Sequence, residues 1–165
     1  MPAVKAGGRA PDFTLPTMAG QKFSLAQALQ RGPVVLAFFK VSCPVCQYAF
    51  PFLERLHQGY IDKPAAVIGV SQNGRQDTAA FQREYGITFP VALDDTGKYP
   101  VSNAYGLTNV PTVFLISPDG SIEVSSVGWA RTEFAEINAR VAATLQASQA
   151  PVFRAGEEVA DWKAG

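Results

Sequence analysis

A six-residue apolar run shortly before two closely spaced cysteines constrains the fold more than any other feature of the chain. Residues 34–39 read VVLAFF, which is typical of a strand that is buried on both faces of its sheet. Cys43 and Cys46 follow as Cys-Pro-Val-Cys, and residues 47–58 have a helical pattern. This order predicts a strand, a turn that carries both thiols, and a helix whose first turn accepts Pro44 because no N–H is needed there.

The thiols therefore lie where a helix N-terminus is predicted. Unpaired N–H groups and the helix dipole make that end partly positive, which favours a thiolate over a thiol. The thiolate is the form of cysteine that attacks disulfides and peroxides. Two intervening residues let the sulfurs of Cys43 and Cys46 close a small ring. A CxxC beside a βαβ pattern predicts a pair that cycles between dithiol and disulfide.

Three other uses of the cysteines have less support. The first is a zinc site, but the two cysteines and His57, the only histidine, supply three of the four ligands that a tetrahedral site needs. A structural disulfide would close a very short loop, and its stabilising effect grows with loop length. Two unreactive core thiols are the third alternative. Because His57 lies late in the predicted helix, we expect a surface or helix-terminal residue rather than a catalytic base.

The composition predicts one globular domain and argues against some partners. The 165 residues are 47% hydrophobic and 17% charged, with 14 basic and 14 acidic side chains. This balance, without a long basic run, argues against nucleic acid or an anionic membrane as a principal partner. No apolar stretch approaches the ~18 residues of a membrane-spanning helix. Residues 1–8 contain no apolar signal region, which predicts a cytoplasmic protein, although a removed signal peptide would leave a similar start.

Strands and helices alternate along the rest of the chain. Strands at 12–16 and 21–23 predict an N-terminal β-hairpin, and Ser24 has the spacing of a helix cap. Further strands are predicted at 65–70, 89–93, 112–116 and 122–127. Further helices are predicted at 77–85, capped by Asp77, at 99–105, and from a cap at Thr132 onward. The pattern predicts an α/β fold with a mixed central sheet, helices on both faces and a hairpin extension.

Several short motifs point to one family. They are APDFTLP at 10–16 with Gly20, the strand ending at Phe39, CPVC at 43–46, Pro51 inside the helix, and VPTVFLI at 110–116. Through these motifs, from about residue 8 to 149, the chain resembles the thioredoxin superfamily. The resemblance is greatest to TlpA-like thiol–disulfide oxidoreductases and the AhpC/TSA redoxins. It implies a thioredoxin-like fold in which a cis bond precedes Pro111 and that proline faces the cysteines.

The resemblance also implies where a substrate binds. Val110 would present its backbone N–H and C=O to a substrate chain, much like a strand added to a sheet edge. We place further substrate contacts at Pro111, Ser42 and Pro44. The implied partners are a protein or small-molecule disulfide and a reductase that recycles the thiols. No metal or organic cofactor is implied.

Three positions depart from the family pattern. Ser42 replaces the usual tryptophan before the first cysteine, and Ala37 and Ala49 stand where relatives carry acidic residues. We therefore predict that no general base lies beside Cys46. Lys40 could favour a thiolate through its charge, or it is simply a solvated loop lysine.

Dithiol exchange is the expected function: Cys43 attacks a disulfide and Cys46 resolves the mixed disulfide. A peroxiredoxin-like hydroperoxide reductase is the first alternative, with Cys46 aligned to the peroxidatic cysteine of those enzymes. Pro111 then occupies the place of their arginine, so the thiolate loses its main electrostatic support unless the fold brings Arg131 near. A non-catalytic redox-sensing binding module is the second alternative.

The last residues exceed what a thioredoxin-like unit needs. We place the domain at 1–149, with residues 1–9 loose, and a C-terminal tail at 150–165. Apolar anchors predict a strap packed over the domain surface: Val152, Phe153, Val159 and Trp162. A second interpretation is a redox arm, because the ending resembles tails of redoxin relatives that continue into a further cysteine or a selenocysteine. That arm requires the tail to end within reach of Cys43.

Overall fold

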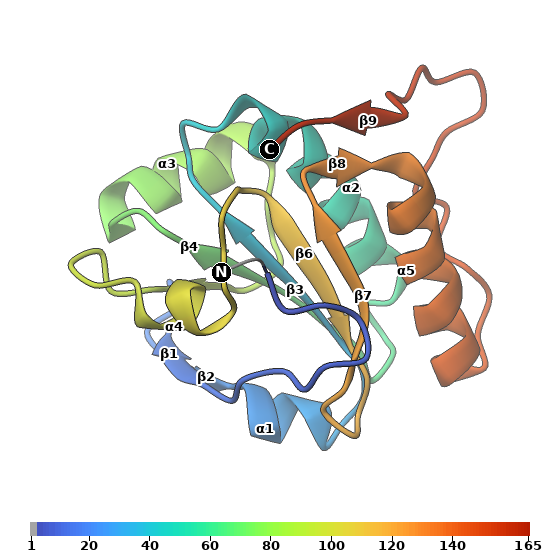
Figure 1. Cartoon of the computed structure of the whole chain (residues 1–165). Coiled ribbons are helices and arrows are strands. Elements are labelled where there is room, and N and C mark those ends of the chain that lie inside the picture. Colours follow the sequence, from blue (N-terminus) through green and yellow to red (C-terminus); the bar gives the residue numbers. More distant parts are fainter. Residues whose placement is uncertain (1–2) are drawn as a thin grey trace.

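A mixed five-stranded sheet forms the centre of the protein (Figure 1). The computed structural model describes residues 3–165. The strand order is β5-β4-β3-β6-β7, with β4 and β5 parallel to β3, and β6 antiparallel to both β3 and β7. The bounds are β3 Val34–Phe39, β4 Ala66–Ser71, β5 Val91–Leu93, β6 Thr112–Ile116 and β7 Ile122–Val127. The predicted central strand and the C-terminal hairpin are confirmed.

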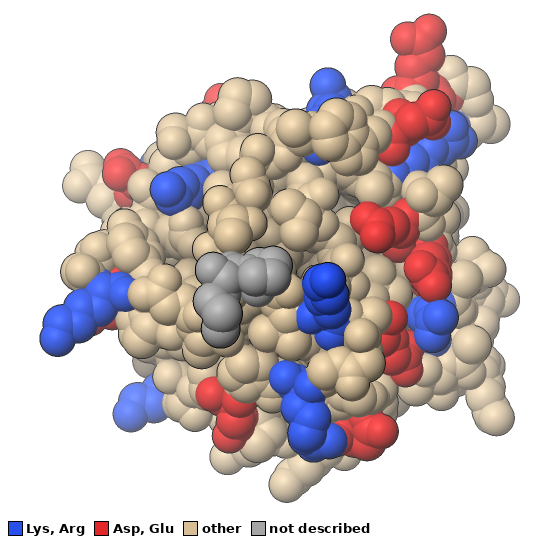
Figure 2. Space-filling model, in the orientation of Figure 1, with Lys and Arg blue, Asp and Glu red and all other residues tan. Residues whose placement is uncertain are grey.

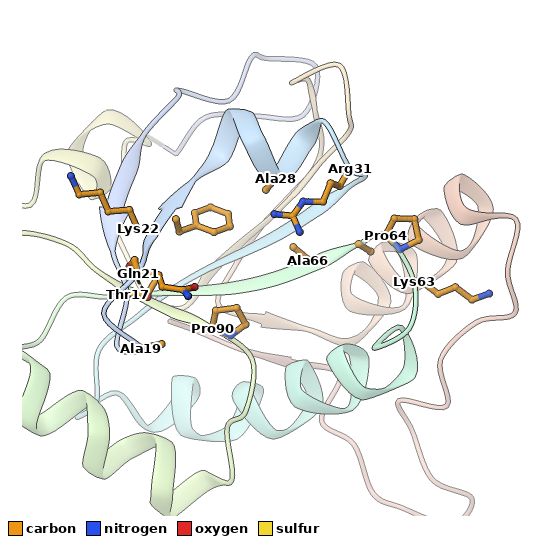
Figure 3. A pocket seen from close by; sticks show the side chains of 12 residues that line it. Thr17, Ala19, Gln21, Lys22, Ala28, Arg31, Lys63, Pro64, Ala66 and Pro90 are labelled. Carbon is orange, nitrogen blue, oxygen red and sulfur yellow. Dashed lines mark hydrogen bonds between the residues drawn. The ribbon is translucent and has the colours of Figure 1, made fainter.

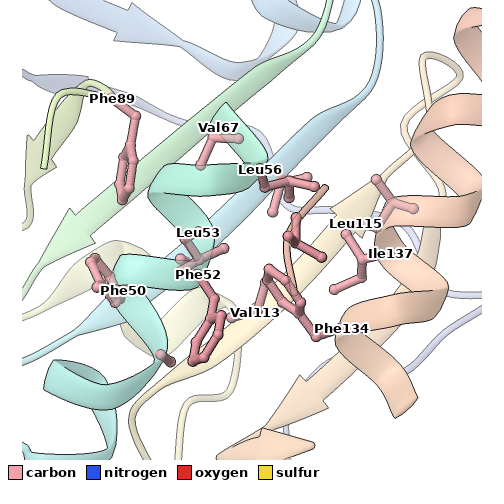
Figure 4. Packing of buried hydrophobic residues seen from close by; sticks show 14 of the residues in the cluster. Phe50, Phe52, Leu53, Leu56, Val67, Phe89, Val113, Leu115, Phe134 and Ile137 are labelled. Atoms are coloured by element: carbon pink, nitrogen blue, oxygen red, sulfur yellow. The ribbon is translucent and has the colours of Figure 1, made fainter. Parts of the chain in front are cut away.

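Side chains of β3 alternate between two hydrophobic clusters, which explains its uninterrupted apolar sequence. Val35, Ala37 and Phe39 pack in a cluster with α2 (Pro44–Gly59), α3 (Arg75–Tyr85) and α5 (Arg131–Leu145). Figure 4 shows this cluster, in which Phe52 and Leu56 of α2 lie between the sheet and Ile137 of α5. The alternate residues of β3 pack in the second cluster with α1 (Leu25–Leu29) and α4 (Pro100–Ala104). Helices therefore cover both faces, as predicted.

The N-terminal extension is tied to the domain more firmly than predicted. β1 (Thr14–Pro16) and β2 (Lys22–Ser24) form the expected antiparallel hairpin. The expectation that residues 1–9 are loose is wrong for those that the structure describes. Val4 donates a hydrogen bond to the Tyr105 carbonyl, and residues 7–10 exchange backbone hydrogen bonds with residues 120–122 beside β7. Residues 1–2 lie outside the described part of the chain.

Two helices begin differently from the prediction. Ser24 caps α1 as expected, but Gly74 rather than Asp77 precedes α3. Asp77 lies inside the first turn of α3, where a negative charge interacts favourably with the positive end of the helix dipole. Ala130 rather than Thr132 precedes α5, and no side chain caps that helix. The Arg131 N–H instead binds the distant carbonyl of Asp161, which no local pattern encodes.

The C-terminal tail is packed against the domain rather than detached from it. Its strand β9 (Trp162–Lys163) pairs antiparallel with β8 (Trp129–Ala130). Arg55 of α2 binds the Glu157 carboxylate through two guanidinium nitrogens, at 2.7 and 2.8 Å. The predicted strap is therefore present, whereas a further thiol beyond Gly165 stays a prediction.

The surface carries interspersed charges. On the face shown in Figure 2, lysine and arginine side chains alternate with aspartate and glutamate, so the described residues form no extended patch of one sign there. Among residues 3–165, no helix has both the length and the apolar character needed to cross a membrane.

Candidate active site

Cys43 lies at the N-terminus of α2, where the sequence predicts it. Its sulfur caps the helix by accepting a hydrogen bond from the backbone N–H of Cys46, at 3.1 Å. The side chain is only partly buried, and Ser42 and Pro44 beside it are exposed. The helix end and its unpaired N–H groups therefore lie against a sulfur that solvent can reach.

Cys46 lies behind Cys43 and is fully buried, with 0% of its surface exposed. Burial raises the pKa of the Cys46 thiol far above its usual value, and the hydrogen bond with the Cys43 sulfur raises it further. Ala37 and Ala49 belong to the same buried cluster. The causes of the shift are burial, the Cys43 sulfur and backbone hydrogen bonds, and the lack of a general base beside Cys46 stays a prediction.

The loop before β6 completes the site. The Val110–Pro111 bond is cis, as predicted. The Cys43 thiol donates a hydrogen bond to the Val110 carbonyl oxygen at 3.4 Å, so this loop faces the reactive sulfur. The Val110 N–H finds no hydrogen-bond partner in the described part of the chain. A free N–H beside a sulfur nucleophile is suited to binding the backbone of an extended peptide.

The other candidate residues contribute less. Lys40 is exposed, and its backbone carbonyl accepts a hydrogen bond from the Cys43 N–H at 3.3 Å. His57 lies in the last turn of α2 with its ring against Phe89, remote from the cysteines. Arg131 places its guanidinium over the Phe153 ring, at 5.4 Å from the ring centroid. Arg131 therefore packs against the tail, and the substitute for a peroxiredoxin arginine is not found at the thiols.

Gly165 lies at the Val110 loop beside Cys43, which the second interpretation of the tail requires, but the sequence did not reveal the contact with Val110 itself. The Asn109 side-chain amide donates a hydrogen bond to the Gly165 carbonyl at 3.2 Å. A Cβ added to Gly165 would lie 2.7 Å from the Val110 carbonyl oxygen, so the tail touches the same carbonyl as Cys43. A signal in the sequence was Gly165 itself, together with Gly128, which packs against Gly165.

A separate cavity of about 350 Å³ opens between the β1–β2 hairpin, α1 and the segment before β4 (Figure 3). Its lining includes Phe23, Arg31 and Pro64, and it contains neither cysteine. Ala66, also in the lining, pairs with Val34 at the start of β3, whereas the cysteines follow the end of β3. The six-residue strand separates the two places by roughly 20 Å, so this cavity takes no part in the thiol chemistry.

The described residues contain no group of three or more His, Cys, Asp or Glu side chains arranged to hold a metal ion.

Comparison with known proteins gives one consistent assignment. Residues 6–125 match the AhpC/TSA family. The thioredoxin-like protein YneN of Bacillus subtilis is 32% identical over 129 residues, covering 76% of this chain and 73% of YneN. The thiol–disulfide oxidoreductase ResA of Geobacillus thermodenitrificans is 30% identical over 122 residues, covering 73% of this chain and 68% of ResA.

The fold is shared with solved structures as well. A Chlorobium tepidum protein, provisionally named thiol:disulfide interchange protein DsbE, superposes with a TM-score of 0.74 at 28% identity, covering 87% of this chain and 99% of that one. Sequence, fold and the placement of Cys43 and Cys46 agree on an oxidoreductase that acts through a CxxC pair. The chain has the thioredoxin fold and belongs to the AhpC/TSA family.

Proposed function

We propose that the protein reduces or exchanges disulfides, with Cys43 as the attacking thiolate and Cys46 as the resolving thiol. One observation carries this assignment of roles. The Cys43 sulfur is accessible at a helix N-terminus, whereas Cys46 is fully buried behind it with a strongly raised thiol pKa. A nucleophile must be reachable by the substrate, and of the two sulfurs only that of Cys43 is exposed to solvent at the helix N-terminus.

The reaction proceeds in two exchanges. The Cys43 thiolate attacks one sulfur of the substrate disulfide, that S–S bond breaks, and the departing sulfur leaves as a thiolate that takes a proton from water. Cys46 then loses its proton to water and attacks the Cys43 sulfur, which releases the second substrate thiolate. The substrate gains two electrons and the protein ends as the Cys43–Cys46 disulfide. An external dithiol reductase restores the pair, and the reverse sequence donates a disulfide.

Hydroperoxide reduction by Cys46 has less support. Its sulfur would have to be ionised and reached by a peroxide, but burial both covers it and favours its neutral form. The guanidinium of Arg131, which the sequence offered as a substitute for the peroxiredoxin arginine, lies over Phe153 in the tail. The proposed substrates are therefore disulfides, above all those of polypeptides that can use the Val110 backbone.

A first prediction tests the roles of the two thiols. The reduced protein should turn over a disulfide, and a hydroperoxide should react far more slowly in a parallel assay. Cys43→Ser should abolish disulfide reduction, because no accessible nucleophile is left. Cys46→Ser should stop after the first exchange and accumulate a mixed disulfide on Cys43, which mass spectrometry identifies after acid quench.

The matched pair of serine variants makes the outcome decisive. A mixed disulfide found on Cys46 in the Cys43→Ser protein would reverse the two roles. Peroxide reduction that survives in Cys43→Ser would favour the peroxiredoxin alternative.

A further inference from the structure

The end of the tail lies on the loop that faces the reactive sulfur. The Val110 carbonyl oxygen accepts the Cys43 thiol at 3.4 Å, and the same carbonyl is in contact with Gly165. Figure 1 shows the C-terminus at the same end of the molecule as the start of α2 and the start of β6. Cys43 and Gly165, which lie more than a hundred positions apart in the sequence, thus meet at the Val110 carbonyl.

The contact is too close for any side chain. A Cβ on Gly165 would lie 2.7 Å from the Val110 oxygen and 3.3 Å from the Gly128 Cα. A Cβ on Gly128 would lie 2.5 Å from the Lys163 carbonyl oxygen and 2.9 Å from the Gly165 nitrogen. Gly128 also has a backbone φ of +77°, which residues that carry a side chain rarely adopt. Two glycines therefore allow the tail to lie against the Val110 loop.

The tail is anchored before this contact but only lightly held at it. Lys163 pairs with Trp129 across β8 and β9, and its ammonium lies 4.9 Å from the Tyr48 ring centroid. The Trp129 indole N–H donates to the Ala160 carbonyl at 2.6 Å. Beyond β9, the hydrogen bond from Asn109 to the Gly165 carbonyl is the only one found among the described residues. Residues 164–165 are therefore held to the domain by fewer hydrogen bonds and packing contacts than β9 and the residues before it.

We propose that the tail end, residues 164–165, sets the substrate selectivity of Cys43 by occupying the Val110 edge. This inference rests on the proposed disulfide exchange. A polypeptide disulfide that aligns its backbone with Val110 must first displace the tail end, whereas a small disulfide needs only the Cys43 sulfur. Apparent affinity falls by the fraction of molecules that are open, so if about a tenth are open the polypeptide binds roughly tenfold more weakly.

The test is a single-turnover measurement that starts from the reduced protein. Two substrates are compared: a linear peptide that carries a disulfide, and the neutral compound bis(2-hydroxyethyl) disulfide. Gly165→Ala and deletion of residues 164–165 should each raise the rate constant for the peptide about three- to tenfold. Both should leave the rate constant for the small disulfide within about twofold of wild type. Gly74→Ala is the matched control, because a Cβ there meets nothing within 4 Å.

Failure of the inference and failure of the proposed function give different results. If neither substrate oxidises the Cys43–Cys46 pair in any variant, the proposed function is wrong. If both substrates react but the peptide rate is unchanged or falls in the two tail variants, the tail end is no barrier and the inference is overturned. An equal rise for both substrates would also overturn it, because the tail would then restrict access to sulfur rather than to the Val110 edge.

Discussion

Cys46 is the residue whose behaviour depends most on its surroundings. The sequence identified it as one of two thiols and predicted that no acid would stand beside it, from Ala37 and Ala49. Sequence alone could not predict its complete burial, because that depends on how α2 packs Cys46 into the hydrophobic cluster between the helix and the sheet. Burial keeps the thiol protonated and so reserves reactivity for Cys43.

A second prediction uses the raised pKa of Cys46. In the reduced protein, the unfolded thiol ionises near about pH 8.5 while the folded thiol stays protonated, so the unfolded state releases its proton first. The folding stability of wild type relative to Cys46→Ala should therefore fall between pH 8 and 10, by at most about 1.4 kcal/mol per pH unit. Urea unfolding in a phosphine reductant measures it. Parallel stability curves for the two proteins would show that burial does not hold the proton on Cys46.

At the scale of elements, local patterns predicted what local sequence controls. The apolar run of β3, the proline in the first turn of α2 and the Ser24 cap of α1 all appear as expected. The starts of α3 and α5 were placed too late, and α5 shows why. Its first N–H is satisfied by Asp161, thirty residues away, rather than by a capping side chain.

A third prediction concerns the link between α2 and the tail. The Tyr48 hydroxyl accepts a hydrogen bond from the Ala160 N–H at 2.9 Å, so Tyr48→Phe leaves that amide without its partner. We expect amide hydrogen exchange at Ala160 to quicken about fivefold, which corresponds to a loss of about 1 kcal/mol. Tyr85→Phe is the control, because the Tyr85 hydroxyl makes no hydrogen bond among residues 3–165. Equal exchange at Ala160 in both variants would mean that other contacts hold the tail.

For the whole molecule, the mixed sheet with helices on both faces was predictable, and so was the meeting of Cys43 with the Val110 loop. The errors lie where the two ends of the chain join the domain. Residues 1–9 were expected to be loose, but residues 7–10 pair with residues 120–122, and neither segment alone indicates this pairing. The tail was predicted as a strap, yet its contact with Val110 depends on a backbone path that no periodicity describes.

A fourth prediction tests a buried network that joins Tyr60, directly after α2, to α5 and the tail. Asn138 accepts the Tyr60 hydroxyl at 2.6 Å and donates to the Ala150 carbonyl at 2.8 Å. Asn138→Ala should lower the free energy of unfolding by about 1–3 kcal/mol, because buried polar groups lose their partners. Asn103→Ala removes an exposed amide that binds the Lys98 carbonyl and should cost less than about 1 kcal/mol. Denaturant unfolding that ranks the two variants the other way would refute the role of the network.

The Cys43 sulfur that caps α2 is also the atom that attacks the substrate disulfide. As a thiolate, Cys43 is a strong acceptor for the Cys46 N–H, but a sulfur bonded to a substrate carries no charge and accepts that hydrogen bond weakly. In the mixed disulfide, the first turn of α2, which contains Cys46, therefore has a weaker capping hydrogen bond. The bond that joins the substrate to Cys43 thus weakens a cap of the helix that carries the resolving thiol.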